Sequence, residues 1–283
     1  MKVSRAIRNQ AGFSLIELMI ASFIGFLAMM GVLYLYKNQS KTMLIQSGAS
    51  EMRMNGQFTL NESQYYLAHA GLGLPANMKN LFLSGGDLVI RMNTTRKSSA
   101  ASMDAASNTS VTYYRIPLAD TGLFSNRAWA AAQVGSGVVE AAIISVAPKA
   151  GDPSGALVAL SGDKAKFSAG TDLYPEERIR LHRCLGSGAD TAENDFRVLQ
   201  DDPGKRAGLV QDSLTLAEGI ESLTYKWFLI NRDSVAALPN NLDSLQRTEI
   251  IVVARSRYQD RKASGDGYKR DTLTAKVGYR RTL

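Results

Sequence analysis

An uninterrupted apolar run near the N-terminus constrains this chain more than any other feature. Residues 13–36 read FSLIELMIASFIGFLAMMGVLYLY, which is 24 positions with a single charged residue, Glu17. At about 1.5 Å per residue, a helix of this length reaches about 36 Å, enough to cross a hydrocarbon core of about 30 Å. The run therefore predicts a membrane-spanning helix.

The segment in front of this run is basic and sets its orientation. Residues 1–12 carry Lys2, Arg5 and Arg8 and no acidic residue. By the positive-inside rule, this end stays cytoplasmic and residues 37–283 are exported. A cleaved secretory signal has a shorter apolar core, followed by its small-residue cleavage site. Here the small residue Gly12 precedes the apolar run, so a cut there would remove the basic residues and keep the helix.

Glu17 is the unusual residue of the run, because a carboxylate in lipid is costly unless it is paired. A cut between Gly12 and Phe13 would create an α-ammonium group about 6 Å from Glu17 along the helix axis. The N-terminus of the helix also favours a negative charge. An axially shifted neighbouring subunit could offer its own ammonium group to Glu17, so we expect Glu17 to act in subunit assembly.

Residues 12–21, GFSLIELMIA, closely resemble the processing site of type IV prepilins. The resemblance implies that a prepilin peptidase cuts after Gly12 and N-methylates Phe13. It also implies that Glu17 is the acidic residue at the fifth position of the mature chain. An uncleaved signal-anchor, in which Glu17 faces a neighbouring helix, is the alternative interpretation.

The helix is predicted to continue from residue 13 to about residue 70. Good helix formers continue beyond Tyr36, and their spacing lets one side of the helix pack while the other side stays exposed to solvent. That packing side consists of Ile45, Ala49, Met52, Gly56, Leu60 and Leu67. Gly71, Gly73 and Pro75 end the helix.

The rest of the chain reads as strands between turn-rich loops, which predicts an α+β fold in which antiparallel sheet packs on the helix. The expected strands are 81–83, 88–92, 111–116, 138–146, 156–160, 178–185, 196–199, 209–216, 220–230, 248–256 and 272–281. Residues 93–110 are expected to form a mobile surface loop, because their small polar side chains cannot bury a face. We divide the chain into a leader (1–12), a transmembrane half-helix (13–36) and an exported head (37–283).

A second resemblance extends along the chain. Residues 53–71, 216–225 and 249–255 look like the corresponding parts of PilW-type minor pilins. The second and third of these segments also resemble the related J-type pseudopilin of type II secretion. The PilW resemblance implies a minor pilin that primes assembly of a type IV pilus and sits at or near its tip. The implied partners are other minor pilins, the major pilin, the inner-membrane assembly platform and the prepilin peptidase, with a tip adhesin as a further candidate.

Composition argues against catalytic and metal chemistry. Cys184 is the one cysteine, which excludes an intramolecular disulfide and a zinc site of several thiolates. His182 and Cys184 share one face of a strand, but two ligands are too few for a metal site. His69 is interpreted as a residue of the helix C-terminus. No nucleophile with a base and an orienting acid is recognisable, so we expect neither an enzyme nor a cofactor.

Two charged segments have competing interpretations. Asp190, Glu193 and Asp195 suggest a calcium loop, but the EF-hand spacing is missing and a solvated acidic turn is favoured. Residues 255–281 contain nine Lys or Arg against three Asp. They are interpreted as solvent-exposed edge strands rather than as a DNA-binding surface. The formal charge of the chain falls from +7 to +4 after cleavage, and the segment has no aromatic interleaving suited to base stacking.

Overall fold

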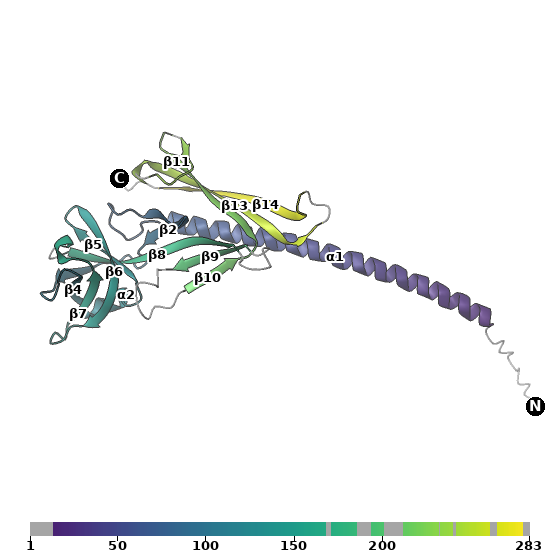
Figure 1. Ribbon diagram of the computed structural model, residues 1–283, viewed down its shortest axis with the longest axis horizontal. Helices are drawn as coiled ribbons and strands as arrows, with labels where there is room; N and C mark the ends of the chain where they lie inside the picture. The colour runs from purple at the N-terminus through teal and green to yellow at the C-terminus, as the bar shows by residue number, and fades with distance from the viewer. Residues whose placement is uncertain are drawn as a thin grey trace, which may run out of the picture.

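The computed structural model describes residues 14–167, 171–185, 194–200, 212–231, 233–239, 242–260 and 265–279. Within them, one long helix carries a head built almost entirely of antiparallel strands (Figure 1). This confirms the predicted α+β, pilin-like fold class. The helices are α1 (Leu15–Ala68) and α2 (Thr121–Phe124), with short 3-10 turns at Leu118–Asp120, Lys164–Lys166 and Leu242–Ser244.

The strands follow in chain order. They are β1 (Leu81–Ser84), β2 (Asp87–Met92), β3 (Ser99–Met103), β4 (Val111–Pro117), β5 (Trp129–Val134), β6 (Gly137–Pro148), β7 (Gly155–Ser161), β8 (Thr171–Leu185), β9 (Asn194–Gln200), β10 (Asp212–Ala217), β11 (Ile220–Leu229), β12 (Ser234–Val235), β13 (Leu245–Gln259) and β14 (Tyr268–Gly278).

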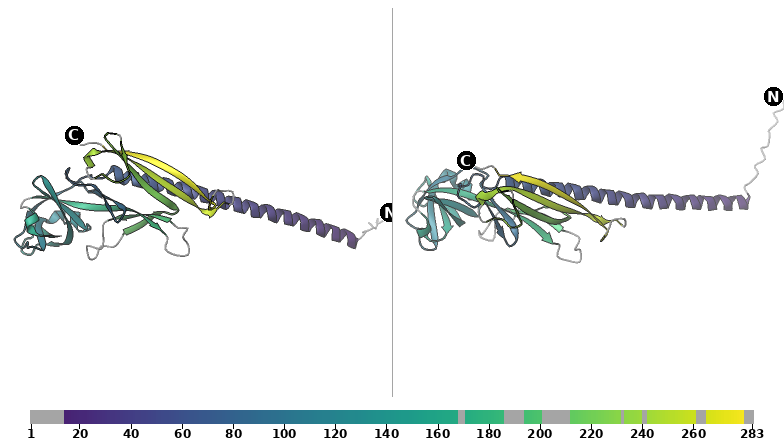
Figure 2. Two further views of the ribbon diagram at one scale, coloured as in Figure 1. Left: turned by 45° about the horizontal axis from the view of Figure 1, so that its top comes forward. Right: turned by 90° about the horizontal axis from the view of Figure 1, so that it is seen from above.

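Helix α1 spans 54 residues, which at 1.5 Å per residue is about 80 Å. Its N-terminal part projects away from the head in every view (Figures 1 and 2). The helix ends where predicted, because Gly71 and Gly73 adopt the positive φ angles of +80° and +68°. The Gly71 N–H then donates to the Arg91 carbonyl at 2.8 Å, which joins the chain after the helix to strand β2.

The C-terminal half of α1 packs against a four-stranded sheet of order β12-β11-β13-β14. Strand β13 alternates as a half-buried strand should: Ile250, Val252 and Ala254 are fully buried and the residues between them are not. The buried residues of α1 are Gly48, Met52, Gly56, Thr59, Leu60, Ser63 and Leu67. The predicted packing side of the helix is therefore confirmed at four of its six positions, and Ile45 and Ala49 are half-buried.

A second group of strands, β1, β2, β8, β9 and β10, closes the core from the other side of the helix in the view of Figure 1. Its contribution to the core comes from alternate residues of neighbouring strands, such as Ile90 of β2 and Ile179 of β8, which are directly paired. The main core of the head thus lies where α1 and the two sheets meet.

The first half of β8 belongs to a closed β-barrel. Strand β8 pairs with β3 on one side and with β5 on the other, and the remaining pairings run β3-β4, β4-β7, β7-β6 and β6-β5. Six antiparallel strands therefore return to their starting point. A separate core fills this barrel, with Tyr114, Ile116, Phe124, Ile143, Leu160 and Leu173 fully buried. The barrel lies at the end of the molecule farthest from the start of α1 (Figure 1).

The expectation of a mobile loop at residues 93–110 is wrong. Residues Ser99–Met103 form strand β3, which bridges β8 and β4 and helps to close the barrel. Asn93, Ser99 and Ala101 are buried, because the partner strand Thr171–Leu185 covers this small-residue segment from far away in the sequence. Strand β5 and the first half of β8 were not predicted either.

Candidate functional site

The candidate site lies at the start of α1, where Glu17 stands in the first helical turn. The backbone N–H of Ser14 donates to Glu17 Oε2 at 3.0 Å, and the Ser14 carbonyl accepts the N–H of Leu18 at 3.1 Å. Ser14 is thus the N-cap residue and Glu17 the third residue of the helix, the positions of a capping box. Among the described residues, no other group bonds to the Glu17 carboxylate, so it can accept a second partner.

The helix that carries Glu17 is exposed over its whole N-terminal half. Every residue from 14 to 44 is solvent-exposed, including large apolar side chains such as Phe23, Leu27 and Leu35. Among the described residues, α1 is the one helix that is long and apolar enough to cross a membrane. None of its apolar window is buried by the head, which distinguishes it from the core helix of a soluble protein.

The remaining residues of the predicted processing site lie outside the described residues. These are Lys2, Arg5, Arg8, Gly12 and Phe13. Cleavage after Gly12, methylation of Phe13 and the assembly role of Glu17 therefore stay predictions.

From Tyr36 to Tyr65, α1 has a line of exposed apolar side chains that sequence analysis missed. Tyr36, Met43, Met54, Phe58 and Tyr65 are 42–71% exposed. At 100° per residue they fall within about 60° of one another, opposite the buried face that carries Met52, Gly56 and Ser63. The spacing of 7, 11, 4 and 7 residues was a helical signal, but it was hidden because apolar residues occur on both faces. We call these five residues the outer stripe.

Two glycines on the buried face let the sheet approach the helix closely. A Cβ atom on Gly48 would lie 2.8 Å from the ring of Tyr258, and one on Gly56 would lie 2.7 Å from Leu273 Cδ1. Gly56 would also come within 3.1 Å of Ala254 Cβ. The sequence offered Gly56 as a packing residue, but the need for glycine is visible only once β13 and β14 are placed.

Each histidine has one neighbouring polar group within hydrogen-bond distance. His69 is the C-cap residue of α1, as its interpretation required, and its Nδ1 lies 2.8 Å from the Tyr65 carbonyl oxygen. His182 Nδ1 lies 2.8 Å from Asp87 Oδ2 across the β2–β8 pairing. Within the described residues, no group of three metal-binding side chains comes together. The side chains of Cys184, Asp190, Glu193 and Asp195 lie outside the described part, so their roles are not tested.

Two basic residues of β14 are paired with carboxylates. Arg270 bonds to both Glu221, at 2.5 Å, and Asp266, at 2.7 Å. This guanidinium holds the pKa of the Asp266 carboxyl at about 2. Lys269 pairs with Asp260 at 3.2 Å.

Lys276 is exposed and has no ion-pair partner among the described residues.

Comparison with known proteins adds one match. Residues 7–33 match the model of the prokaryotic N-terminal methylation motif, and this range covers the predicted cut site, Glu17 and most of the apolar run. The chain begins as type IV pilin-like proteins do. No curated protein and no solved structure is significantly similar to the chain.

The motif and the exposed helix together fit membrane anchoring and association with other pilus components.

Proposed function

We propose that this chain is a minor pilin of the PilW type that primes a type IV pilus and sits at or near its tip. The observation that carries the proposal is the methylation motif at residues 7–33, which lies on a helix whose apolar N-terminal part is not covered by the head. A head of 247 residues, 37–283, is large for a subunit repeated along a thin filament. A barrel at the end remote from the membrane helix suits a subunit with nothing stacked above it.

In this proposal the precursor is held in the bacterial inner membrane by residues 13–36, with its N-terminus cytoplasmic and its head periplasmic. The prepilin peptidase cuts between Gly12 and Phe13 and methylates the new N-terminus. The mature helix then leaves the bilayer by joining a bundle of similar helices.

The charge of Glu17 favours the transfer of the helix from the bilayer into the filament. The carboxylate is bonded by one backbone N–H of its own chain, which only partly compensates a charge in lipid. An ammonium group from an adjoining subunit would complete the pairing. Assembly would therefore relieve a cost that the membrane-stored subunit carries.

The outer stripe extends the same interface into the exported half of the helix. Its side chains are exposed on the isolated chain, and their apolar area is removed from water when another helix lies against them. The partners proposed are the other minor pilins, the major pilin and the assembly platform, with a tip adhesin as a further partner.

Two other functions remain to be separated from this one by experiment. A J-type pseudopilin of a secretion system would share the architecture, and its gene would lie beside secretion genes rather than pilus genes. A DNA-binding pilin would retain DNA in a strongly salt-dependent way. The pairing of Arg270 and Lys269 with carboxylates argues against it.

The proposal is tested by replacing Gly12 with leucine and examining sheared filaments. The precursor should stay uncut and filaments should become scarce, whereas the matched change Gly25→Ala should leave processing intact. Immunogold label on the chain should gather at filament ends. Normal piliation with an uncut Gly12→Leu precursor would contradict the processing step, and label along the shaft would contradict the tip position.

A further inference from the structure

The barrel meets the rest of the head at a short stretch of β8. Leu173, on the inward face of this strand, belongs to the barrel core, whereas Ile179 and Leu181 on the same face belong to the core around α1. Pro175 and Glu177 lie between them on this face; both are buried, and Glu177 is only 3% exposed. At this point a proline and a buried carboxylate separate the two hydrophobic cores.

Two side chains bond to Glu177: one lies just before a barrel strand, and the other lies in the connection from β2 to the barrel. Arg127, just before β5, pairs with the Glu177 carboxylate, and the Thr94 hydroxyl donates to the same oxygen. These contacts cross between the part of the chain that forms the barrel and the strand that runs into the main core.

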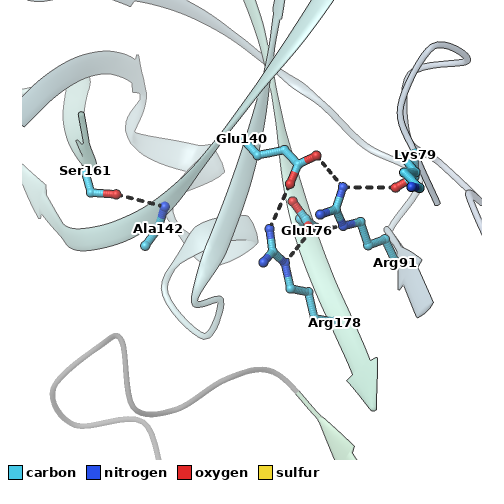
Figure 3. Close-up of polar contacts among 7 residues, drawn as sticks. All are labelled: Lys79, Arg91, Glu140, Ala142, Ser161, Glu176 and Arg178. Atoms are coloured by element: carbon cyan, nitrogen blue, oxygen red, sulfur yellow. Dashed lines mark hydrogen bonds and ion pairs between the residues drawn. The ribbon is translucent and has the colours of Figure 1, made fainter. Parts of the chain in front are cut away.

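The opposite face of β8 carries a second ionic cluster at the same level (Figure 3). Arg178 donates its Nε to Glu176 at 2.6 Å and its Nη2 to Glu140 at 3.1 Å. Arg91 of β2 pairs with Glu140 of β6 and lies 3.3 Å from Glu176. Glu140 thus ties a barrel strand to β2, which lies outside the barrel.

Three members of this second cluster, Arg91, Glu176 and Arg178, are largely shielded from water, whereas the Glu140 side chain is 29% exposed. The Glu176 side chain has no exposed surface, and its Oε2 is buried without a hydrogen-bond partner. Aromatic rings flank the two guanidinium groups: that of Arg91 lies 4.3 Å from the Phe82 ring centroid, and that of Arg178 lies 3.3 Å from the Trp129 ring centroid. Burial raises the pKa of Glu176 and lowers that of Arg91, so each charge depends on its neighbours.

From this arrangement we propose that the barrel is a separate module, held in one orientation by an ionic joint on both faces of β8. We name the joint by its residues: Arg91, Arg127, Glu140, Glu176, Glu177 and Arg178. An apolar junction tolerates small shifts, because burial has no preferred direction. Charge pairs with fixed geometry do not, because a displaced buried charge loses its partner. The inference does not depend on the proposed function.

The test measures the orientation directly. Spin labels at Ser145 on β6 and Lys226 on β11, both exposed, report the distance between the barrel and the helix-bearing sheet in the full-length chain in detergent. The labels are placed in a Cys184→Ser background. We expect a single narrow distance distribution for this chain, and a distribution at least twice as broad when Glu140→Gln removes one carboxylate from two guanidinium groups.

The matched control is Asp152→Asn. It breaks the Arg115–Asp152 ion pair of 2.6 Å, which lies wholly within the barrel. We expect this variant to keep the narrow distribution. Amide hydrogen exchange of β7 and β13 should be unchanged in both variants, which shows that each core stays folded.

A second variant, Arg127→Gln, tests the other face of β8 and should also broaden the distribution. An unchanged width in both Glu140→Gln and Arg127→Gln would overturn the proposal. So would broadening accompanied by faster exchange within β7, because the cluster would then stabilise the barrel itself instead of its orientation.

Discussion

The backbone N–H of Ser14 is bonded to the carboxylate of Glu17, three residues later, at 3.0 Å. A capping box of this kind accepts glutamine as well as glutamate, because both side chains end in an oxygen acceptor. Pairing with an ammonium group requires the charge. The two roles of Glu17 can therefore be separated by a single pair of substitutions.

Glu17→Ala and Glu17→Gln should both be cleaved and both assemble poorly. The Glu17→Gln variant would keep the cap, which is worth about 1 kcal/mol at a helix N-terminus, but it would lose the ion pair. We expect the amount of chain in sheared filaments to fall about tenfold or more in both variants, measured by immunoblot against the cell-bound fraction. Normal incorporation of Glu17→Gln would show that Glu17 serves only as a helix cap.

Met43 should matter for assembly and not for folding. It is 71% exposed in the outer stripe, so Met43→Ser removes little buried area from the head. Incorporation into filaments should fall, while the free energy of unfolding should change by less than about 0.5 kcal/mol. Gln64→Ser, an exposed position on the same helix outside the stripe, is the control and should leave both unchanged. Equal incorporation of the two variants would contradict a role for the stripe.

Gly56→Val should destabilise the head by about 1–3 kcal/mol, because its side chain would meet Leu273 and Ala254. Denaturant titration of the mature chain in detergent, followed by the fluorescence of buried Trp227, measures this loss. Gly122→Val is the matched control, since nothing lies within 4 Å of a Cβ at that position. If Gly56→Val unfolded at the same denaturant concentration as the unsubstituted chain, helix α1 could not be as close to β14 as described.

Acid should weaken the barrel through Asp152. The hydrogen bond from Arg115 lowers the pKa of this carboxyl to about 2, from 3.8 in an unstructured chain. A depressed pKa means that its stabilisation is complete above about pH 4 and is lost as the pH falls towards 2. The melting temperature should fall in this window, and less steeply in Asp152→Asn. Parallel pH profiles for the two chains would contradict the assignment.

The long helix was predictable because its signals are local. The apolar run, the charge of Glu17 and the terminating Gly71 all lie within or beside the element that they define. The packing side of the helix could also be read from its spacing, although the outer stripe was missed.

The closure of the barrel was not predictable. Strands β4, β6 and β7 were expected from the sequence, but β3, β5 and the first half of β8 depend on distant partners. Strand β3 consists of small residues, and its burial depends on β8, about 70 residues later. Strand β5 contains Ala130, Ala131 and Ala132, and alanine has low β-propensity. The ionic joint was even less predictable from the sequence, because Arg91, Glu140 and Glu176 come from three strands that only the topology brings together.

The most direct test of the account is mass spectrometry of the N-terminal tryptic peptide from chain recovered in assembled filaments. We expect a peptide that begins at Phe13, ends at Lys37 and carries one methyl group on its terminal amine. Filaments that contain the chain with Met1 still attached would contradict the account, because Glu17 would then have no terminal ammonium group to meet.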